Sequence, residues 1–339
     1  MADEGGSVKK NTAPAHYAKR VISIEEKERL YRRWIDQAVF DRKANVSGAC
    51  LHFYSNTERW TGEWDSNWFF MDESIRSHGK LFAIDTVAHE TGGKGKRHKT
   101  ANKKPTELYD PISRTLFFMD AGYYGWLKSA ALALVGDVLE DNHRIFSIHG
   151  ALLSVDGKGV SLIGPSGTGK TTLSYGLLLD PCVKLVADDW HFFKFVNSEA
   201  TGYASEKNTY IRADVASVWK EYKQLLEGAK LDNRGRAVVD VGRAIGKNKL
   251  EMTADMRYVV LLQRDKTKPI IRELSAKEAV DYLVKNDYCN PHTLQKNAWK
   301  QKVRKEAFLQ LFKSCRVLLL NTIETPEQSL QRIKDFIGI

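Results

Sequence analysis

The sequence predicts a mixed α/β fold. Short apolar runs typical of β-strands alternate with segments of helical apolar spacing along most of its 339 residues. A glycine-rich loop at 164–171 lies between an apolar run and a helical segment, in the strand–loop–helix order of phosphate-binding α/β proteins. Hydrophobic residues make up 42% of the chain and charged residues 28%, close to the globular average, so we expect a buried core.

The first part of the chain, residues 21–122, is predicted to be an α+β region behind a flexible polar tail at 1–20. Ser23 is followed three positions later by Glu26, the pattern of a helix-capping box, and the apolar spacing behind it predicts a helix over about 23–41. Strand-like runs follow at 49–54, 68–71, 81–85 and 115–120.

The net charge of +10 comes in large part from one loop at 92–105, which holds six basic residues and no acid. A stretch of this composition is typically a flexible, solvated loop. A contact with an anion or a nucleic acid is the alternative interpretation, although no aromatic residue interleaves the charges to stack on bases.

Residues 123–339 are predicted to form a second domain around the glycine-rich loop. Ser275 and Thr325 are expected N-caps of two of its helices. An apolar stripe between Trp299 and Phe312 predicts a core-facing helix with a solvated basic face. The other expected elements are helices at 126–140 and 169–179, hairpin strands at 148–155 and 160–163, and strands at 184–187, 258–263 and 317–321.

Composition excludes several classes of protein. Mean hydropathy is −0.41 and no run of 18 apolar residues occurs, so no membrane span is predicted. The first six residues contain no apolar segment of a secretory signal. Four widely spaced cysteines without a CxxC pair argue against a disulfide framework or a zinc site, and they indicate a cytoplasmic location.

Residues 164–171 read Gly-Pro-Ser-Gly-Thr-Gly-Lys-Thr, which matches the Walker A pattern. Glycines let backbone N–H groups turn toward phosphate oxygens, and the following helix points its positive end at the same anion. Lys170 adds a positive charge for the β and γ phosphates, and the Thr171 hydroxyl is a ligand for Mg²⁺. The pattern therefore predicts an ATP and Mg²⁺ site. Its expected contacts are Gly164, Ser166, Gly167, Thr168, Gly169, Lys170, Thr171 and Thr172.

Two adjacent carboxylates, Asp188 and Asp189, follow the apolar run at 183–187. Like charges are costly to bring together without a cation, so a metal held between these acids, Thr171 and a nucleotide would offset the repulsion. A solvated strand end is the alternative interpretation. His149 precedes the loop, at the start of the predicted hairpin; a single histidine in such a place is more often structural than functional.

Taken together, these residues resemble the nucleotide-binding core shared by ATP-dependent phosphoenolpyruvate carboxykinase and HPr kinase/phosphorylase. The matching features are His149-Gly150, the hairpin, the loop at 164–171 and the Asp188-Asp189 pair. Residues 166–174 are very close to the carboxykinase loop, whereas the spacing from His149 to the loop suits the HPr kinase version. The resemblance covers about residues 60–265, is specific over 149–189, and implies a shorter, diverged P-loop kinase of this superfamily.

Looser similarity surrounds this core. Residues 123–128 resemble the carboxykinase segment with an active-site Tyr and a metal-binding Lys, here Lys128. Glu206 lies in a stretch similar to one that carries a Glu near the nucleotide phosphates. The carboxykinase places an arginine on the γ-phosphate in a segment similar to 233–236, which leaves Arg234 and Arg236 as alternatives.

Two departures from the resembled families concern the substrate. Glu63 falls where the carboxykinase has an arginine that holds its carboxylic substrate, and an anion there should repel oxaloacetate. Thr172 replaces the acid that follows the HPr kinase loop. The chain is also much shorter than the carboxykinase. The resemblance therefore implies a retained phosphoryl-transfer half and a changed substrate half.

We therefore expect an ATP-dependent kinase that transfers the γ-phosphoryl group to a hydroxyl acceptor. A carboxykinase with a carboxylic substrate and a nucleotide-binding regulatory protein without catalysis stay open as alternatives. Thr171 and Asp188 are expected to hold Mg²⁺. Asp189, His149 and Lys128 are expected to form either a second metal site, for Mn²⁺, or a general-base cluster. The expected catalytic residues are Lys170, Asp188, Asp189, His149 and one of Arg234 and Arg236.

Overall fold

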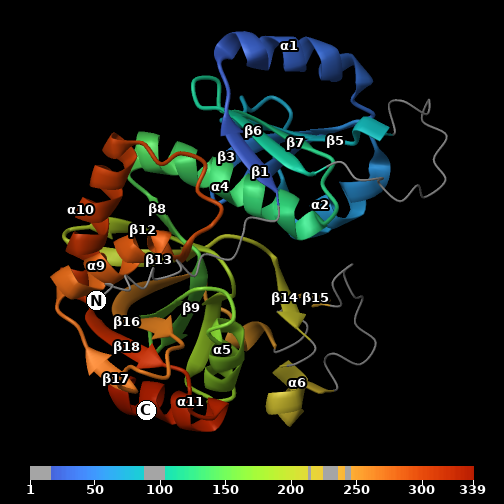
Figure 1. Cartoon of the computed structure of the whole chain (residues 1–339). Helices are drawn as coiled ribbons and strands as arrows, with labels where there is room; N and C mark the ends of the chain where they lie inside the picture. Colours follow the sequence, from blue (N-terminus) through green and yellow to red (C-terminus); the bar gives the residue numbers. More distant parts are fainter. Residues whose placement is uncertain (1–16, 88–103, 213–214, 224–235, 241–245) are drawn as a thin grey trace, which may run out of the picture.

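The computed structural model describes residues 17–87, 104–212, 215–223, 236–240 and 246–339 (Figure 1). Two large mixed β-sheets and the helices packed on them form most of the described part, so the predicted mixed α/β fold class is confirmed. Arg234, most of the basic loop at 92–105 and residues 1–16 of the expected tail lie outside the described residues. None of the described helices is both long and apolar enough to cross a membrane.

The first sheet has seven strands in the order β1-β6-β7-β5-β3-β2-β4. Helix α1 (Ile24–Trp34) covers one face and α4 (Tyr124–His143) the other (Figure 1). Alternation along the strands explains this, because successive side chains point to opposite faces. The strands are β1 (Ala18–Val21), β2 (Phe40–Val46), β3 (Ala49–Ser55), β4 (Phe69–Phe70), β5 (Gly79–Ile84), β6 (Thr106–Asp110) and β7 (Thr115–Met119).

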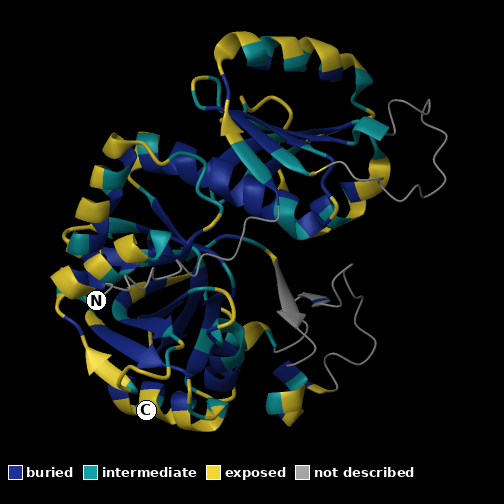
Figure 2. Cartoon of the chain, in the orientation of Figure 1, coloured by how far each residue is buried: buried dark blue, intermediate teal, exposed yellow. Residues whose placement is uncertain are grey.

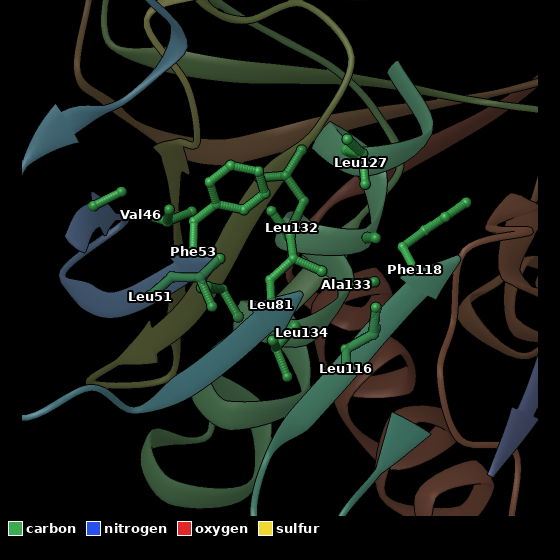
Figure 3. Close-up of a cluster of buried hydrophobic side chains, with 14 of the residues drawn as sticks. Val46, Leu51, Phe53, Leu81, Leu116, Phe118, Leu127, Leu132, Ala133 and Leu134 are labelled. Carbon is green, nitrogen blue, oxygen red and sulfur yellow. The ribbon is translucent and has the colours of Figure 1, made fainter. Parts of the chain in front are cut away.

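The side of the first sheet that faces α4 holds a large apolar cluster. Leu81 of β5 and Leu116 of β7 pack there with Leu127, Leu132 and Leu134 of α4 (Figure 3). The same cluster includes two aromatic residues, Trp190 and Phe192, from the second sheet's part of the chain. Helix α4 therefore joins the two sheets through one continuous core, and it is buried along most of its length (Figure 2).

The second sheet contains nine strands, with β16 (Thr253–Gln263) at its centre. Strand β16 pairs in parallel with β10 on one side and β18 on the other, and its first residues pair with β13. The remaining bounds are β8 (Phe146–Ile148), β9 (Gly150–Val155), β10 (Lys158–Ile163), β11 (Val183–Ala187), β12 (His191–Val196), β13 (Glu199–Ala204), β17 (Ile271–Glu273) and β18 (Arg316–Asn321).

Helices cover both faces of the second sheet (Figure 1). On one face α5 (Lys170–Leu178) and α11 (Pro326–Ile337) contribute to one apolar cluster; on the other, α9 (Ala276–Lys285) and α10 (Ala298–Ser314) contribute to another. Capping boxes begin α9 at Ser275 and α11 at Thr325, as predicted. Shorter elements are α2 (Thr61–Asn67), α6 (Val215–Val218) and a two-stranded ribbon of β14 (Asn208–Arg212) and β15 (Arg236–Asp240).

Three predicted boundaries are wrong. Residues 18–20 belong to strand β1, not to a flexible tail, because β1 pairs in parallel with β6. The helix predicted over 23–41 ends its α-helical part at Trp34, since the chain turns extended at Ala38 and then pairs as β2. The hairpin arm predicted over 148–155 is two strands, because the pairing partner changes at His149 from β12 to β10 and β11.

The predicted basic face of α10 is also wrong in part. Lys300 and Arg304 are buried against acidic residues of α4, whereas Trp299 of the predicted apolar stripe is half exposed. The helix is therefore held to α4 by buried charges as well as by apolar packing.

One edge of the second sheet collects the two loops that carry the predicted site residues. Strands β10, β16 and β18 are parallel, and β11 runs the same way because both β10 and β11 pair antiparallel with β9. Their carboxyl ends therefore lie at the same edge. The glycine-rich loop follows β10 there, and Asp188-Asp189 follows β11.

Candidate nucleotide-binding site

The loop at 164–169 has the shape that its glycines allow. Gly167 and Gly169 have φ values of +84° and +91°, in the left-handed region that favours glycine. Gly164 is packed so tightly that a Cβ would lie 2.7 Å from Thr168 Oγ1. Thr168 closes the loop by donating from its hydroxyl to the Pro165 carbonyl at 2.8 Å. A compact turn results.

Helix α5 begins directly behind this loop. Its N-cap is Gly169, and no side chain caps it, so its first N–H groups are available to an anion. Lys170 donates from Nζ to the carbonyls of Gly164, at 2.6 Å, and Pro165, at 3.3 Å. Burial lowers the Lys170 pKa, and the nearby Asp189 carboxylate opposes that shift. The loop thus carries an ammonium group beside the positive end of a helix, which is complementary to phosphate.

A cluster of charged side chains lies next to Lys170. Lys128 reaches from α4 and contacts Asp189 Oδ2 at 3.3 Å and Glu206 Oε1 at 3.0 Å. Glu206 is enclosed, and burial is the main cause that raises the pKa of its carboxyl. Residue 207, the neighbour of Glu206, donates from its backbone N–H to the Asn67 carbonyl at 3.3 Å. The cluster therefore sits where the two sheets' parts of the chain meet.

His149 joins this cluster from the junction of β8 and β9. Its Nε2 lies 3.6 Å from Asp189 Oδ1, and its Nδ1 lies 2.9 Å from the Cys289 carbonyl oxygen. Burial lowers the pKa of His149, which favours the neutral imidazole. A neutral ring that faces a carboxylate is suited to sharing a cation or a proton with it.

Sequence reasoning missed His292, which lies beside His149, and Tyr17, which contacts His292. The His292 ring lies 5.6 Å from the His149 ring, and its Nδ1 lies 3.1 Å from the Tyr17 hydroxyl. His292 follows Pro291 in a stretch without a motif, and Tyr17 lies in the predicted tail. No local pattern marks either residue, because only packing between distant segments brings them to the site.

Five predicted residues meet in the structure: Lys128, His149, Lys170, Asp189 and Glu206. Asp188 is buried at the end of β11 and Thr171 lies in the first turn of α5, both at the same edge of the sheet. Among the alternative arginines, Arg236 begins strand β15, and its side chain lies outside the described structure.

The residues present fit a hard divalent cation whose remaining ligands are phosphate oxygens. Within the described ranges, no group of three or more His, Cys, Asp or Glu side chains is arranged to hold a metal ion. Magnesium usually takes one or two carboxylates together with phosphate oxygens and water. Thr171, Asp188 and Asp189 offer the hydroxyl and carboxylate oxygens that it prefers, beside a loop shaped for phosphate.

Comparison with known proteins gives a distant structural likeness. No protein-family model matches the chain, and no curated protein matches it. The structure of the HPr(Ser) kinase/phosphatase from Coxiella burnetii is similar with a TM-score of 0.31 and 16% sequence identity. The match covers 57% of this chain and 96% of that one. A likeness this distant does not bear on the reaction.

Proposed function

We propose that the protein is an ATP-dependent phosphotransferase that moves the γ-phosphoryl group to a hydroxyl acceptor. The observation that carries this proposal is the Walker A loop between β10 and α5, with Lys170 beside the cluster of Lys128, His149 and Asp189. A phosphate site alone would serve a nucleotide-binding regulator equally well. The adjoining acid–base cluster supports catalysis.

Phosphoryl transfer needs positioning and charge neutralisation more than covalent chemistry. The N–H groups of the loop and of the first turn of α5 bind the phosphates, and Lys170 neutralises charge on the β and γ oxygens. Thr171 and Asp188 are the proposed holders of Mg²⁺, which when bound would neutralise further phosphate charge. One of Arg234 and Arg236 is proposed to reach the γ-phosphate.

The acceptor side of the reaction is assigned to Asp189. One of its oxygens faces Lys128 and the other faces His149. The carboxylate is therefore oriented from both sides, and it takes the acceptor's hydroxyl proton as the oxygen attacks the γ-phosphorus. Lys128 bridges the carboxylates of Asp189 and Glu206, and it adds positive charge near the transferred group.

Calorimetry with MgATP tests the phosphate site. Lys170→Ala removes the cation that faces the β and γ phosphates, so we expect a large loss of affinity in a folded protein. The matched control is Lys158→Ala, a lysine exposed at the opposite end of β10. Equal affinities for the wild type and a folded Lys170→Ala variant would refute the assignment.

A carboxykinase is the second candidate, because Lys128, His149 and Asp189 meet as the resemblance implies for a Mn²⁺ site. A lysine ligand must be a neutral amine, whereas Lys128 is ion-paired with two carboxylates here. An assay of oxaloacetate-dependent ADP formation distinguishes the two functions. We expect no turnover, and a rate of about 1 s⁻¹ or faster, ordinary for an enzyme on its own substrate, would establish the carboxykinase instead.

A further inference from the structure

Three consecutive residues between α9 and α10 adopt a left-handed backbone. Asp287, Tyr288 and Cys289 have φ values of +52°, +54° and +53°. Residues with a Cβ adopt this region at an energetic cost, and they usually do so singly. A run of three without a glycine is therefore maintained by its surroundings, and such strain is concentrated at functional sites.

Contacts on every side hold this turn. Cys289 donates its N–H to the Asn286 carbonyl at 2.9 Å, and Asn290 donates to the Asp287 carbonyl at 3.1 Å. Tyr288 packs its ring against Phe308 of α10, with the ring centroids 5.4 Å apart. Asp287 forms an ion pair with Lys296. The turn is thus tied to its own flanks and to the helix behind it.

The turn brings the Cys289 carbonyl to the site, where its oxygen lies 2.9 Å from His149 Nδ1. A carbonyl oxygen only accepts hydrogen bonds, so the proton of a neutral imidazole must be on Nδ1. The other ring nitrogen then carries a lone pair. That nitrogen, Nε2, is the one 3.6 Å from Asp189 Oδ1.

The resulting pair is selective for what it binds. A nitrogen lone pair and a carboxylate oxygen both accept and neither donates, so together they attract a cation or a hydroxyl donor. Two ligands of one divalent cation at about 2.1 Å are roughly 3–3.5 Å apart, which is close to the observed separation. The opposite tautomer would place an N–H on Nε2 facing Asp189 Oδ1, and the two atoms would then no longer be a pair of acceptors.

We propose that the left-handed turn at 287–289 is a positioning element of the site, which holds His149 as its Nδ1–H tautomer so that Nε2 and Asp189 together receive a cation or the acceptor hydroxyl. Its role in catalysis rests on the proposed phosphotransfer function, whereas the tautomer itself does not. His149 and Asp189 touch the ligand; residues of the turn act through them.

Long-range ¹H–¹⁵N correlation spectra of the free protein report the histidine tautomer directly. We expect His149 of the wild type to be a single Nδ1–H species. An Nε2–H species, or a mixture of the two, would overturn the proposal. The spectrum is recorded without nucleotide, so its outcome is independent of whether the protein binds MgATP.

A pair of variants at Asp287, the half-buried first residue of the turn, tests its role. Asp287→Val and Asp287→Gly both lose the ion pair with Lys296, but only glycine accepts a positive φ without strain. We expect the valine variant to show mixed tautomers and a kcat lower by roughly tenfold or more, with little change in KM for MgATP. The glycine variant should keep the single tautomer. Identical tautomers in the two variants would show that the turn does not position His149.

Cys289→Gly is the second test and does not depend on the valine variant folding. It keeps the carbonyl, removes the thiol and relieves backbone strain at the residue that contacts His149. The Nδ1–H tautomer should persist in this variant. Its loss would assign the effect to the thiol rather than to the turn's backbone, and would refute the proposal.

Discussion

Gly164 and Gly167 serve the loop for different reasons, and the difference is measurable. At Gly164 an added Cβ would lie 2.8 Å from both Leu262 Cβ and the Leu262 carbonyl oxygen. Leu262 belongs to strand β16, so its backbone cannot move aside easily. At Gly167 the φ of +84° is the constraint, and nothing lies within 4 Å of the added atom. We predict that Gly164→Ala lowers the free energy of unfolding by about 1–3 kcal/mol.

Gly167→Asn is the matched comparison, because asparagine tolerates the left-handed region. We expect it to cost less than Gly164→Ala in urea denaturation. A larger loss for Gly167→Asn would mean that the space at Gly167 is occupied in solution.

His191 is a buried histidine that makes stability depend on pH. Its Nδ1 lies 2.9 Å from the Gly150 carbonyl oxygen and its Nε2 lies 3.2 Å from Ser161 Oγ. Burial lowers the pKa of His191 to about 4. Between pH 6.5 and 4, His191 is therefore protonated in the unfolded chain and neutral in the folded protein. The contribution of His191 to the free energy of unfolding is fully present above pH 6.5. It falls by about 3 kcal/mol as the pH drops toward 4.

Urea denaturation at pH 7.5, 5.5 and 4.5 measures this dependence. His191→Gln removes one titrating group, so its stability should fall less steeply with acidification than that of the wild type. The pKa values of the buried histidines His149 and His292 are lowered as well, so both contribute to the slope that remains. Parallel pH profiles for the two proteins would contradict the prediction.

The sequence predicted residues of the site that lie in continuous motifs. The loop at 164–171 and the pair Asp188-Asp189 are recognisable because the residues of each motif are adjacent in the sequence. The Cys289 carbonyl could not be predicted, since it acts through backbone geometry and any residue type offers a carbonyl. The same limit applies to His292, whose place depends on packing across the chain.

Among the elements, helices α4 and α10 are linked by buried ion pairs. Lys300 contacts Asp137 Oδ1 at 2.8 Å and Glu140 Oε1 at 3.4 Å, and Arg304 Nε contacts Glu140 Oε2 at 2.8 Å. Burial raises the pKa of the Glu140 carboxyl, so its charge depends on these partners. The two helices are therefore coupled through groups that are costly to leave unpaired.

Lys300→Met should be strongly destabilising for this reason. We predict a loss of about 3–5 kcal/mol, because two buried carboxylates lose a partner. Lys302→Met, on the exposed face of the same helix, is the control and should change stability by less than about 0.5 kcal/mol. Equal effects of the two substitutions in chemical denaturation would show that the buried network contributes nothing.

Elements with a clear apolar period were predicted best. Helix α5, strand β11 and strand β18 agree with the predictions to within a residue or two. These elements are buried, so most of their residues are apolar and the pattern is clear in the sequence. Strand β6 was missed, since the carboxylate of Glu107 interrupts its apolar pattern. That carboxylate is buried and lies 3.3 Å from Lys19 Nζ of β1. A charge satisfied by a distant partner cannot be distinguished from a solvated one in sequence.

At the scale of the whole molecule, the two sheets share an apolar core in addition to the polar contacts at their junction. Trp190 and Phe192 belong to the same apolar cluster as Leu81 and α4. We predict that both parts unfold in one transition, with coincident changes in far-UV circular dichroism and tryptophan fluorescence. Leu132→Ala, in the middle of α4, should shift both signals together. Two separate transitions would show that the parts are energetically independent.

The order of strands in the second sheet has a consequence for synthesis on the ribosome. Strand β10 ends at Ile163, but β16, its partner on one side, begins only at Thr253. At about 5–20 residues per second, β10 emerges roughly 5–20 s before that partner exists. During this interval the apolar edge next to the phosphate loop has no strand to pair with, and an unpaired edge is where nascent chains aggregate. Yield of the newly made protein should therefore depend on chaperones that bind extended apolar segments, even though the finished fold covers that edge completely.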